Sequence, residues 1–280
     1  MIRLEAGDAA ALILPEQGAA LARLDHAGRA LVAPLPEGAE PGRGWFAAFL
    51  MAPWTNRLDA GRFTASGVEH RMPINRPEEN TAIHGFLRDM PWTVREASAD
   101  AAVLDCSFDR APFKGSARMT LRLHPDHLAM SFALTNHGAA PVPMGFGWHP
   151  YFARHPGTRL RFVARTAFGR NARGLAVDPH ASQGLDATLD WLEGLDGHFA
   201  GWDGTLHLDW PDGSGLLLQA EGAWAKNLHV FVPRGADAVA LEPVSHAPNA
   251  ANDDAAAGHG AMHVLQPGAT LDGSLRIHWR

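Results

Sequence analysis

Apolar and polar residues alternate most regularly between residues 116 and 138. Every second residue is apolar from Met119 to Leu123, and again from Leu128 to Leu134 after the tetrapeptide His-Pro-Asp-His at 124–127. A period of two on both sides of such a turn is typical of a β-hairpin. Because its other face carries polar or small residues, we expect this hairpin to pack one side on a core.

The same alternation returns in weaker form at residues 228–232, 239–241 and 271–279, and the best helical candidate is the short segment 187–193. Strands separated by turns, without alternating helices, predict an all-β fold, a large antiparallel β-sandwich. No repeat of fixed period and no long linker interrupts the chain, so we expect one domain over residues 1–280. Residues 36–44 and 250–261 are rich in Gly, Pro, Ala and Asp, which predicts mobile surface loops.

Composition narrows the possible partners. The chain has 280 residues, 46% of them hydrophobic, with a formal net charge of −6 and no basic run. This argues against nucleic acid and against an anionic membrane surface as partners. The apolar run Ala9–Leu14 is too short for a signal segment, and no stretch reaches the roughly 20 apolar residues of a spanning helix, so we expect a cytoplasmic protein. The single cysteine, Cys106, excludes an intrachain disulfide and lies in an apolar run typical of a core.

Several familiar motifs are incomplete in this chain. Among 16 histidines, His124 and His127 flank a turn, while His259 and His263 lie among glycines that disfavour a helix. Neither pair matches a metal-binding motif, so we expect no metal site. The stretch GFGWHP has Pro150 where a dinucleotide-binding loop needs its third glycine, and no GxSxG is present. We therefore expect no cofactor.

Two ionisable residues stand directly before prolines: His149 before Pro150, and Glu242 before Pro243. A residue before proline is restricted to extended geometry, which limits the directions in which its side chain points. Taken singly, each is better explained by a proline that ends a strand. Four aromatic residues surround His149, and burial among them lowers a histidine pKa, whereas a facing carboxylate would raise it. The function of His149 thus depends on a carboxylate partner.

A series of motifs along the chain resembles the aldose 1-epimerase, or galactose mutarotase, family. That family carries an Asn-Arg element, a His-Gly element, an HPYF-like element, an Asp-x-x-Phe element and a late EP…PNA element. All five occur here in order within residues 56–252, at Asn56-Arg57, His84-Gly85, 149–152, Asp196–Phe199 and 242–250. The resemblance covers most of the chain and is closest to the shorter bacterial members.

The resemblance implies a large antiparallel β-sandwich that interconverts the anomers of a free aldose without a cofactor. It implies that Glu242 is the general base and His149 the general acid, held as an imidazolium by the facing carboxylate. The implied sugar-binding residues are Asn56, Arg57, His84 and Asp196, with an aromatic surface from Trp148 or Phe86. The expected partner is a small-molecule sugar, and the expected assembly is a monomer or a homodimer.

Two other functions stay open at this stage. A hexose-6-phosphate 1-epimerase would need basic residues near the sugar phosphate, and Arg43, Arg62, Arg76 and Arg88 are available. A non-catalytic carbohydrate-binding or sensing protein is the third possibility, but a pure binder has no need for an opposed acid and base. Opening a hemiacetal ring does need both, because either proton transfer alone leaves an unstable charge.

Overall fold

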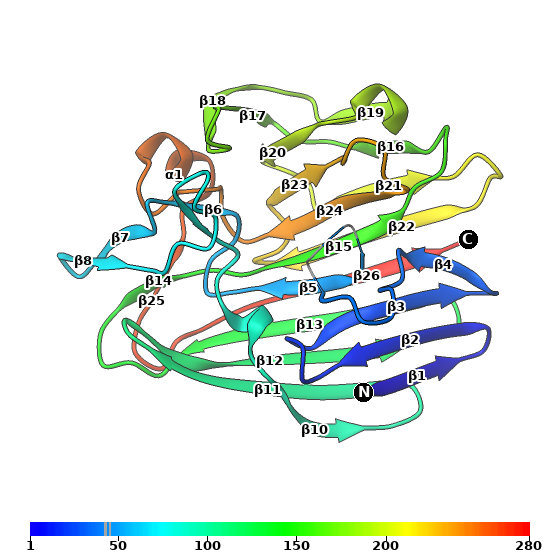
Figure 1. Cartoon of the computed structure of the whole chain (residues 1–280), viewed down its shortest axis with the longest axis horizontal. Helices are drawn as coiled ribbons and strands as arrows, with labels where there is room; N and C mark the ends of the chain where they lie inside the picture. Colours follow the sequence, from blue (N-terminus) through cyan, green and yellow to red (C-terminus); the bar gives the residue numbers. More distant parts are fainter. Residues whose placement is uncertain (42–43, 45) are drawn as a thin grey trace.

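The computed structural model, which describes residues 1–41, 44 and 46–280, consists mainly of two large antiparallel sheets (Figure 1). This confirms the predicted β-sandwich. The eleven-stranded sheet contains, in order, β1 (Ile2–Ala6), β2 (Ala9–Leu14), β3 (Ala20–His26), β4 (Arg29–Val32), β15 (Gly147–Ala153), β24 (Ala238–Val244), β23 (Asn227–Phe231), β20 (Asp196–Ala200), β17 (Thr166–Arg170) and β18 (Ala176–Ala181), with β5 (Ala48–Met51) paired to β15 and β3.

The nine-stranded sheet contains, in order, β10 (Thr93–Ala97), β11 (Ala101–Arg110), β12 (Phe113–Leu123), β13 (His127–Asn136), β26 (Thr270–Trp279), β22 (Gly215–Gly222), β21 (Thr205–Asp209), β16 (Arg159–Phe162) and β19 (Leu185–Thr188). Three small sheets pair β14 (Val142–Met144) with β25 (His263–Leu265), β6 (Arg57–Asp59) with β9 (Thr81–Ile83), and β7 (Arg62–Ala65) with β8 (Val68–Arg71). The strands β6, β7, β8, β14 and β25 gather at one end of the molecule, on the left in Figure 1.

The predicted hairpin is present as β12 and β13, paired in continuous antiparallel register from Gly115–Asn136 to Leu123–Leu128. Its apolar positions are buried and its intervening positions are mostly not, as the alternation predicts. β26 continues the same sheet beside β13. One apolar cluster joins residues of both sheets, from Leu4 near the start of the chain to Trp279 near its end, and it includes Cys106.

One of the local predictions is wrong, and another is confirmed in part. Residues 250–261 are not all loop, because α1 (Asp254–Gly260) forms there. Asp253 caps this helix by accepting from the backbone N–H groups of Ala255 and Ala256, and the following alanines favour helix enough to tolerate Gly258. The helical segment expected at 187–193 is a short 3₁₀ helix, η2 (Leu189–Leu192), which directly follows β19.

Of the predicted loop at 36–44, residues 36–41 and 44 contain no helix or strand, and 42–43 lie outside the described residues. Among the residues that the structure describes, the helical segments are all too short and too polar to cross a bilayer.

The eleven-stranded sheet is covered on both of its faces near its middle, since every residue of β15 and β24 is buried. One face packs in the main core through Trp148, Phe152 and Leu241. On the opposite face, Tyr151 and Ala240 belong to a second, smaller apolar cluster. Chain segments between β5 and η1 (Leu87–Asp89) contribute to the walls around this second face, and the candidate site lies there.

Candidate active site

A cavity of about 770 Å³ opens on the outer face of the eleven-stranded sheet. Its volume is within the range of small-molecule sites. Six of the eight predicted site residues line it. The lining comprises Gly44, Phe49, Asn56, Arg57, Asn75, Arg76, Glu79, Ile83, His84, Arg88, Asp89, His149, Tyr151, Arg170, Asp196, His229, Phe231 and Glu242.

Strand register places the central residues in one row across the sheet. Phe49 of β5 pairs with His149 of β15, and Glu242 of β24 pairs with His229 of β23. Between β15 and β24, the pairs Gly147–Val244 and Tyr151–Ala240 bracket His149 and Glu242, which puts these two opposite each other. The two prolines that follow them have no N–H for the ladder, so the sheet is locally open where the side chains meet.

The carboxylate and the imidazole are in direct contact. Glu242 Oε1 lies 3.1 Å from His149 Nε2, and only 2% and 6% of these side chains are exposed. Glu242 Oε2 and His149 Nδ1 have no hydrogen-bond partner among the described residues. Buried polar atoms are normally paired, so these two atoms retain unused bonding capacity.

Burial raises the pKa of Glu242 well above its ordinary value, against the opposing charge of Arg57. Burial also lowers the pKa of His149 well below its ordinary value, and the positive charge of Arg88 acts in the same direction. Both shifts favour a protonated carboxyl and a neutral imidazole that share one proton. Both directions run against the expected imidazolium, because burial disfavours the charged form of each group.

His84 and Asn56 are locked to each other by their backbones. Both have positive φ, 65° and 51°, which is uncommon for residues other than glycine. The His84 N–H donates to the Asn56 carbonyl at 3.1 Å, and the Asn56 N–H donates to His84 Nδ1 at 3.2 Å. Burial lowers the pKa of His84 well below its ordinary value, so the ring is neutral. Because Nδ1 accepts, the ring proton is on Nε2, and His84 is a hydrogen-bond donor.

One wall of the cavity is charged. Arg57 binds Glu79 in a bidentate pair, with Nε–Oε2 and Nη2–Oε1 distances of 2.8 and 2.9 Å, and this bonding lowers the pKa of Glu79. Asp196 accepts from His229 Nε2 at 2.8 Å and forms an ion pair with Arg170. Burial, with the charges of Arg57 and Arg170, lowers the pKa of His229 to about 3. This wall thus holds fixed donors and acceptors of the kind that bind hydroxyl groups.

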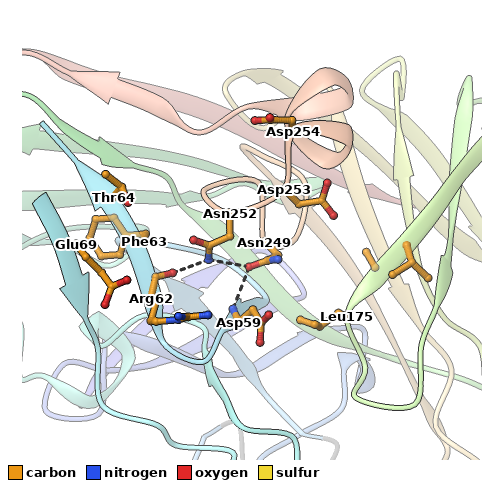
Figure 2. Close-up of a pocket in the computed structure, with 12 residues that line it drawn as sticks. Asp59, Arg62, Phe63, Thr64, Glu69, Leu175, Asn249, Asn252, Asp253 and Asp254 are labelled. Atoms are coloured by element: carbon orange, nitrogen blue, oxygen red, sulfur yellow. Dashed lines mark hydrogen bonds between the residues drawn. The ribbon is translucent and has the colours of Figure 1, made fainter. Parts of the chain in front are cut away.

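The EP…PNA segment contributes more than Glu242. Its Asn249, with φ of 58°, accepts from the Asp59 N–H at 2.9 Å through Oδ1, and its own N–H donates to the Arg57 carbonyl at 3.0 Å. Asn252 then donates to Asn249 Oδ1 at 3.0 Å and to the Arg62 carbonyl at 2.5 Å. Figure 2 shows the side-chain bonds of Asn249 and Asn252 to each other, to Asp59 and to Arg62, beside a second cavity of about 500 Å³. The motif therefore anchors β6, the strand that carries Arg57.

Two predicted site residues do not reach the cavity. Trp148 and Phe86 are 2% and 7% exposed and pack in the main core. Trp148 precedes His149 on β15, and successive side chains of a strand point to opposite faces, so the two cannot share the cavity. The aromatic surfaces of the cavity are Phe49, Tyr151 and Phe231 instead. The Phe49 ring stacks on the His149 ring at 4.5 Å.

The sequence reasoning also missed several lining residues. Tyr151 could have been predicted from the sequence, because it lies two positions after His149 on the same strand and therefore on the same face. His229 is the polar position in the alternating run LHVF, so its side chain could have been predicted to lie on the face opposite the main core. Phe49, Glu79 and Arg170 carry no such signal, because only the tertiary fold brings them to the cavity.

The comparisons with known proteins concern the family and the fold. The sequence model of the family described as aldose 1-epimerase matches residues 1–278. Among curated proteins, the uncharacterized protein YphB of Escherichia coli K12 is 27% identical over 247 residues, which is 82% of this chain and 83% of YphB. The uncharacterized protein YihR of the same organism is 31% identical over 203 residues, which is 71% of this chain and 63% of YihR.

Among solved structures, a galactose mutarotase-like protein from Clostridium acetobutylicum superposes with a TM-score of 0.88. The alignment covers 99% of this chain and 94% of that protein at 16% identity, which supports the fold alone.

Proposed function

The chain belongs to the aldose 1-epimerase family, and we propose that it interconverts the α and β anomers of a free aldose by opening and reclosing the sugar ring. The observation that carries the proposal is the buried contact of 3.1 Å between Glu242 and His149 within a cavity of sugar size. An acid and a base that share one proton are what this reaction needs, since it neither consumes nor releases protons.

In the ring-opening step, Glu242 takes the proton of the C1 hydroxyl while His149 gives a proton to the ring oxygen. The C1–O bond to the ring oxygen breaks and a C1 carbonyl forms. Rotation about C1–C2 presents the other carbonyl face, and closure reverses both transfers. Bound sugar hydroxyls and the nearby Arg57 favour the carboxylate form of Glu242, so that the shared proton moves to His149 before the ring opens.

After ring opening, the carboxyl is protonated and the imidazole is neutral. This is the form that burial favours. The open-chain intermediate therefore leaves the pair in its preferred protonation state, which lowers the cost of the intermediate relative to the cyclic sugar. Arg57, His84 and Asp196 would hold the ring hydroxyls during this step, and Phe49 or Phe231 would offer an apolar surface to the ring C–H groups.

The test is polarimetry on freshly dissolved α-glucose and α-galactose, together with NMR exchange spectroscopy on equilibrated sugars. We expect the protein to speed the approach to anomeric equilibrium, and Glu242→Gln to lose most of this activity while it stays folded. Sugar binding without any rate acceleration over buffer would favour the non-catalytic reading and contradict the proposal.

A phosphorylated aldose is the second candidate substrate, because Arg76 and Arg88 both line the cavity. Of the other arginines considered, Arg62 lines the second cavity and Arg43 lies outside the described residues. Each cavity arginine has a carboxylate nearby, Glu78 at 3.6 Å from Arg76 and Asp89 at 3.7 Å from Arg88. The same assay with glucose 6-phosphate separates the candidates: a kcat/KM that exceeds the one for glucose would favour the phosphorylated sugar.

A further inference from the structure

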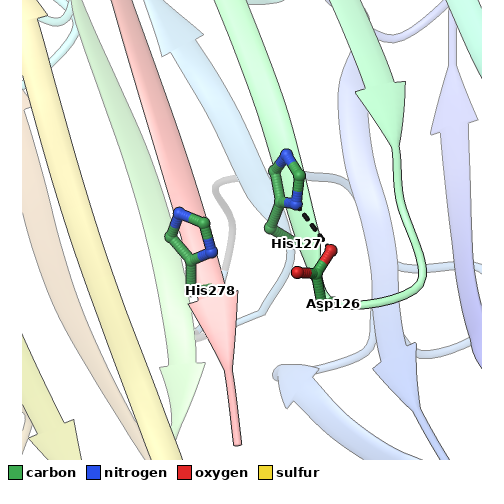
Figure 3. A group of neighbouring side chains, drawn as sticks. All are labelled: Asp126, His127 and His278. Carbon is green, nitrogen blue, oxygen red and sulfur yellow. Dashed lines mark hydrogen bonds and ion pairs between the residues drawn. The ribbon is translucent and has the colours of Figure 1, made fainter.

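A second group of histidines lies on the nine-stranded sheet, away from the cavity. His127 begins β13, directly after Asp126 in the hairpin turn, and His278 lies near the end of β26. The two histidines are direct register partners on adjacent antiparallel strands. Both follow the alternation that buries Leu128 and Ile277, so their side chains are on the solvent face of the sheet. Figure 3 shows the three side chains side by side.

These side chains bring three metal-ligand atoms together. One ligand atom each from Asp126, His127 and His278 lies within 4.8 Å of the other two. His127 Nδ1 is 2.8 Å from Asp126 Oδ1, and the His127 and His278 rings are 4.8 Å apart at an angle of 26°. Among the residues that the structure describes, His, Cys, Asp and Glu side chains meet in this way at this place alone.

We propose that Asp126, His127 and His278 form a binding site for one divalent transition-metal ion of the Zn²⁺ class. Zinc bonds to imidazole nitrogen and carboxylate oxygen are about 2.0–2.2 Å long. Tetrahedral bonds of this length hold neighbouring ligand atoms about 3.3–3.6 Å apart, so small rotations of partly exposed side chains bring the three atoms into place. Two imidazoles favour Zn²⁺, Ni²⁺ or Cu²⁺ over Mg²⁺ and Ca²⁺, which prefer oxygen ligands.

The backbone under this site is already fixed. Nine consecutive register pairs join β13 to β26. Trp279 ties the turn to β26, because its Nε1 donates to the Pro125 carbonyl at 3.1 Å and its backbone N–H donates to the Asp126 carbonyl at 3.3 Å. The ring of His124 stacks on His127 at 4.1 Å and 9°, so His127 must give up part of this contact when its ring turns toward an ion. A preorganised backbone reduces the ordering that binding requires.

Access and charge also permit an ion. The Asp126 side chain is 75% exposed, so an ion can enter from solvent and keep water on its remaining positions. The Asp126 carboxylate supplies the negative charge, and Arg276, whose positive charge acts on His278, opposes binding. We therefore expect moderate affinity. The bound ion would link the hairpin turn to the last strand, and it would stabilise the sheet without entering the cavity.

The experiment uses untagged protein stripped with EDTA and dialysed into metal-free, phosphate-free buffer at pH 7.5. Titration with ZnCl₂ in a calorimeter should give one site per chain, with a dissociation constant on the order of micromolar. His278→Asn should weaken binding by at least about tenfold. His180→Asn, which removes an exposed histidine of β18, is the matched control and should bind as the parent does.

Asp126→Asn is the second variant, and it keeps the turn geometry while it removes the charged ligand. Zn²⁺ should raise the melting temperature of the parent and of His180→Asn, and it should raise that of Asp126→Asn and His278→Asn much less. Absence of saturable binding by the parent would overturn the proposal. So would unchanged affinity in both His278→Asn and Asp126→Asn, which would place the ion elsewhere.

Discussion

Two of the carboxylate–imidazole pairs in this protein lie in different environments, and burial gives their carboxyl groups opposite pKa shifts. On the nine-stranded sheet, His127 Nδ1 bonds Asp126 Oδ1 at 2.8 Å beside solvent. On the eleven-stranded sheet, His149 Nε2 lies 3.1 Å from Glu242 Oε1 with almost no exposure. The hydrogen bond from His127 lowers the pKa of Asp126, whereas burial raises the pKa of Glu242.

The difference teaches that contact between a carboxylate and an imidazole does not by itself decide which of them holds the proton. In water the ionised carboxylate is solvated, and the pair behaves as an ordinary surface interaction of small energy. Away from water both charges are penalised, and the proton is shared between two nearly neutral groups. Of these two pairs, the buried one is therefore the one suited to the proposed proton transfer to and from a sugar without help from solvent.

The largest expected effect comes from removing one imidazole in each environment. His149→Asn should lower kcat for anomerisation by about 10²–10⁴-fold, since it removes one positioned acid–base group. His127→Asn removes an imidazole that also faces a carboxylate, and it should change kcat less than about twofold. The rates are measured by polarimetry at saturating sugar, after circular dichroism shows that both variants are folded. Equal activity of the two variants would refute the assignment of the proton-transfer pair.

The strands and the proposed proton-transfer pair could be predicted from the sequence, whereas most of the residues around them could not, for a physical reason. Alternation in β12, β13 and β26 predicted the strands, because a strand with one buried face needs a period of two. The ordered motifs identified Glu242 and His149. The neighbours of these residues, such as Phe49 and Arg170, come from strands far away in sequence, so no local pattern marks them. For the same reason no local pattern marked the proposed metal site, since His278 comes next to Asp126 and His127 only as the register partner of His127 on the last strand.

The prediction of a loop at residues 250–261 was wrong for a different reason. Gly258 and Gly260 argued against helix, but α1 needs only seven residues and gains its first turn from the Asp253 cap. The prediction that Trp148 lines the sugar site was wrong because the face of its strand was not considered. His149 and Trp148 are adjacent in sequence and therefore on opposite faces. Both errors came from judging residue types without the geometry of their element.

The second effect concerns two buried arginines, one in the cavity and one outside it. Arg57→Ala should raise KM by about 10- to 100-fold with a smaller change in kcat, because a charged hydrogen bond to a sugar hydroxyl is worth about 1.5–3 kcal/mol. Arg154 is the control, since it is equally buried and binds Asp190 and Glu193 at 3.1 and 3.0 Å, outside the cavity lining. Arg154→Ala should lower stability yet leave KM near that of the parent. A fall in kcat alone for Arg57→Ala would contradict a binding role.

The third effect is acid sensitivity of the fold. Burial lowers the folded-state pKa of the five buried histidines below their ordinary value of 6.5; these are His84, His149, His198, His229 and His246. Below pH 6.5 the unfolded chain then binds more protons than the folded one, so stability falls as pH falls. Each such histidine contributes up to about 1.4 kcal/mol per pH unit. The raised pKa of Glu242 acts in the opposite direction above pH 4.5, but it is one group against five.

Urea unfolding at pH 7.5, 6.5, 5.5 and 4.5 measures this dependence. His198→Gln keeps a donor for Asn227 Oδ1, which His198 Nε2 contacts at 3.1 Å, but it removes one titrating ring. It should reduce the slope of stability against pH by roughly one histidine's share, whereas the exposed control His180→Gln should not. A free energy of unfolding that stays constant from pH 7.5 to 4.5 would show that these rings are not held neutral.

The smallest effect concerns the group that helps to keep His149 neutral from a distance. Arg88 lies over the Phe49 ring at 4.5 Å, and Phe49 stacks on His149. After burial, the charge of Arg88 is the next cause of the lowered pKa of His149. With that charge removed in Arg88→Met, the imidazole should accept a second proton at higher pH, because a cation no longer opposes it. The doubly protonated pair has no base, so the acid limb of the kcat–pH profile should move toward neutral pH. We expect the rate at any one pH to change less than about tenfold, since the acid and the base both remain.

Arg110 offers a matched control, because it lies over the Phe86 ring at 4.8 Å in the core rather than at the cavity. Arg110→Met should therefore leave the acid limb of the kcat–pH profile in place. A limb that stays fixed or moves to lower pH in Arg88→Met would mean that burial alone keeps His149 neutral.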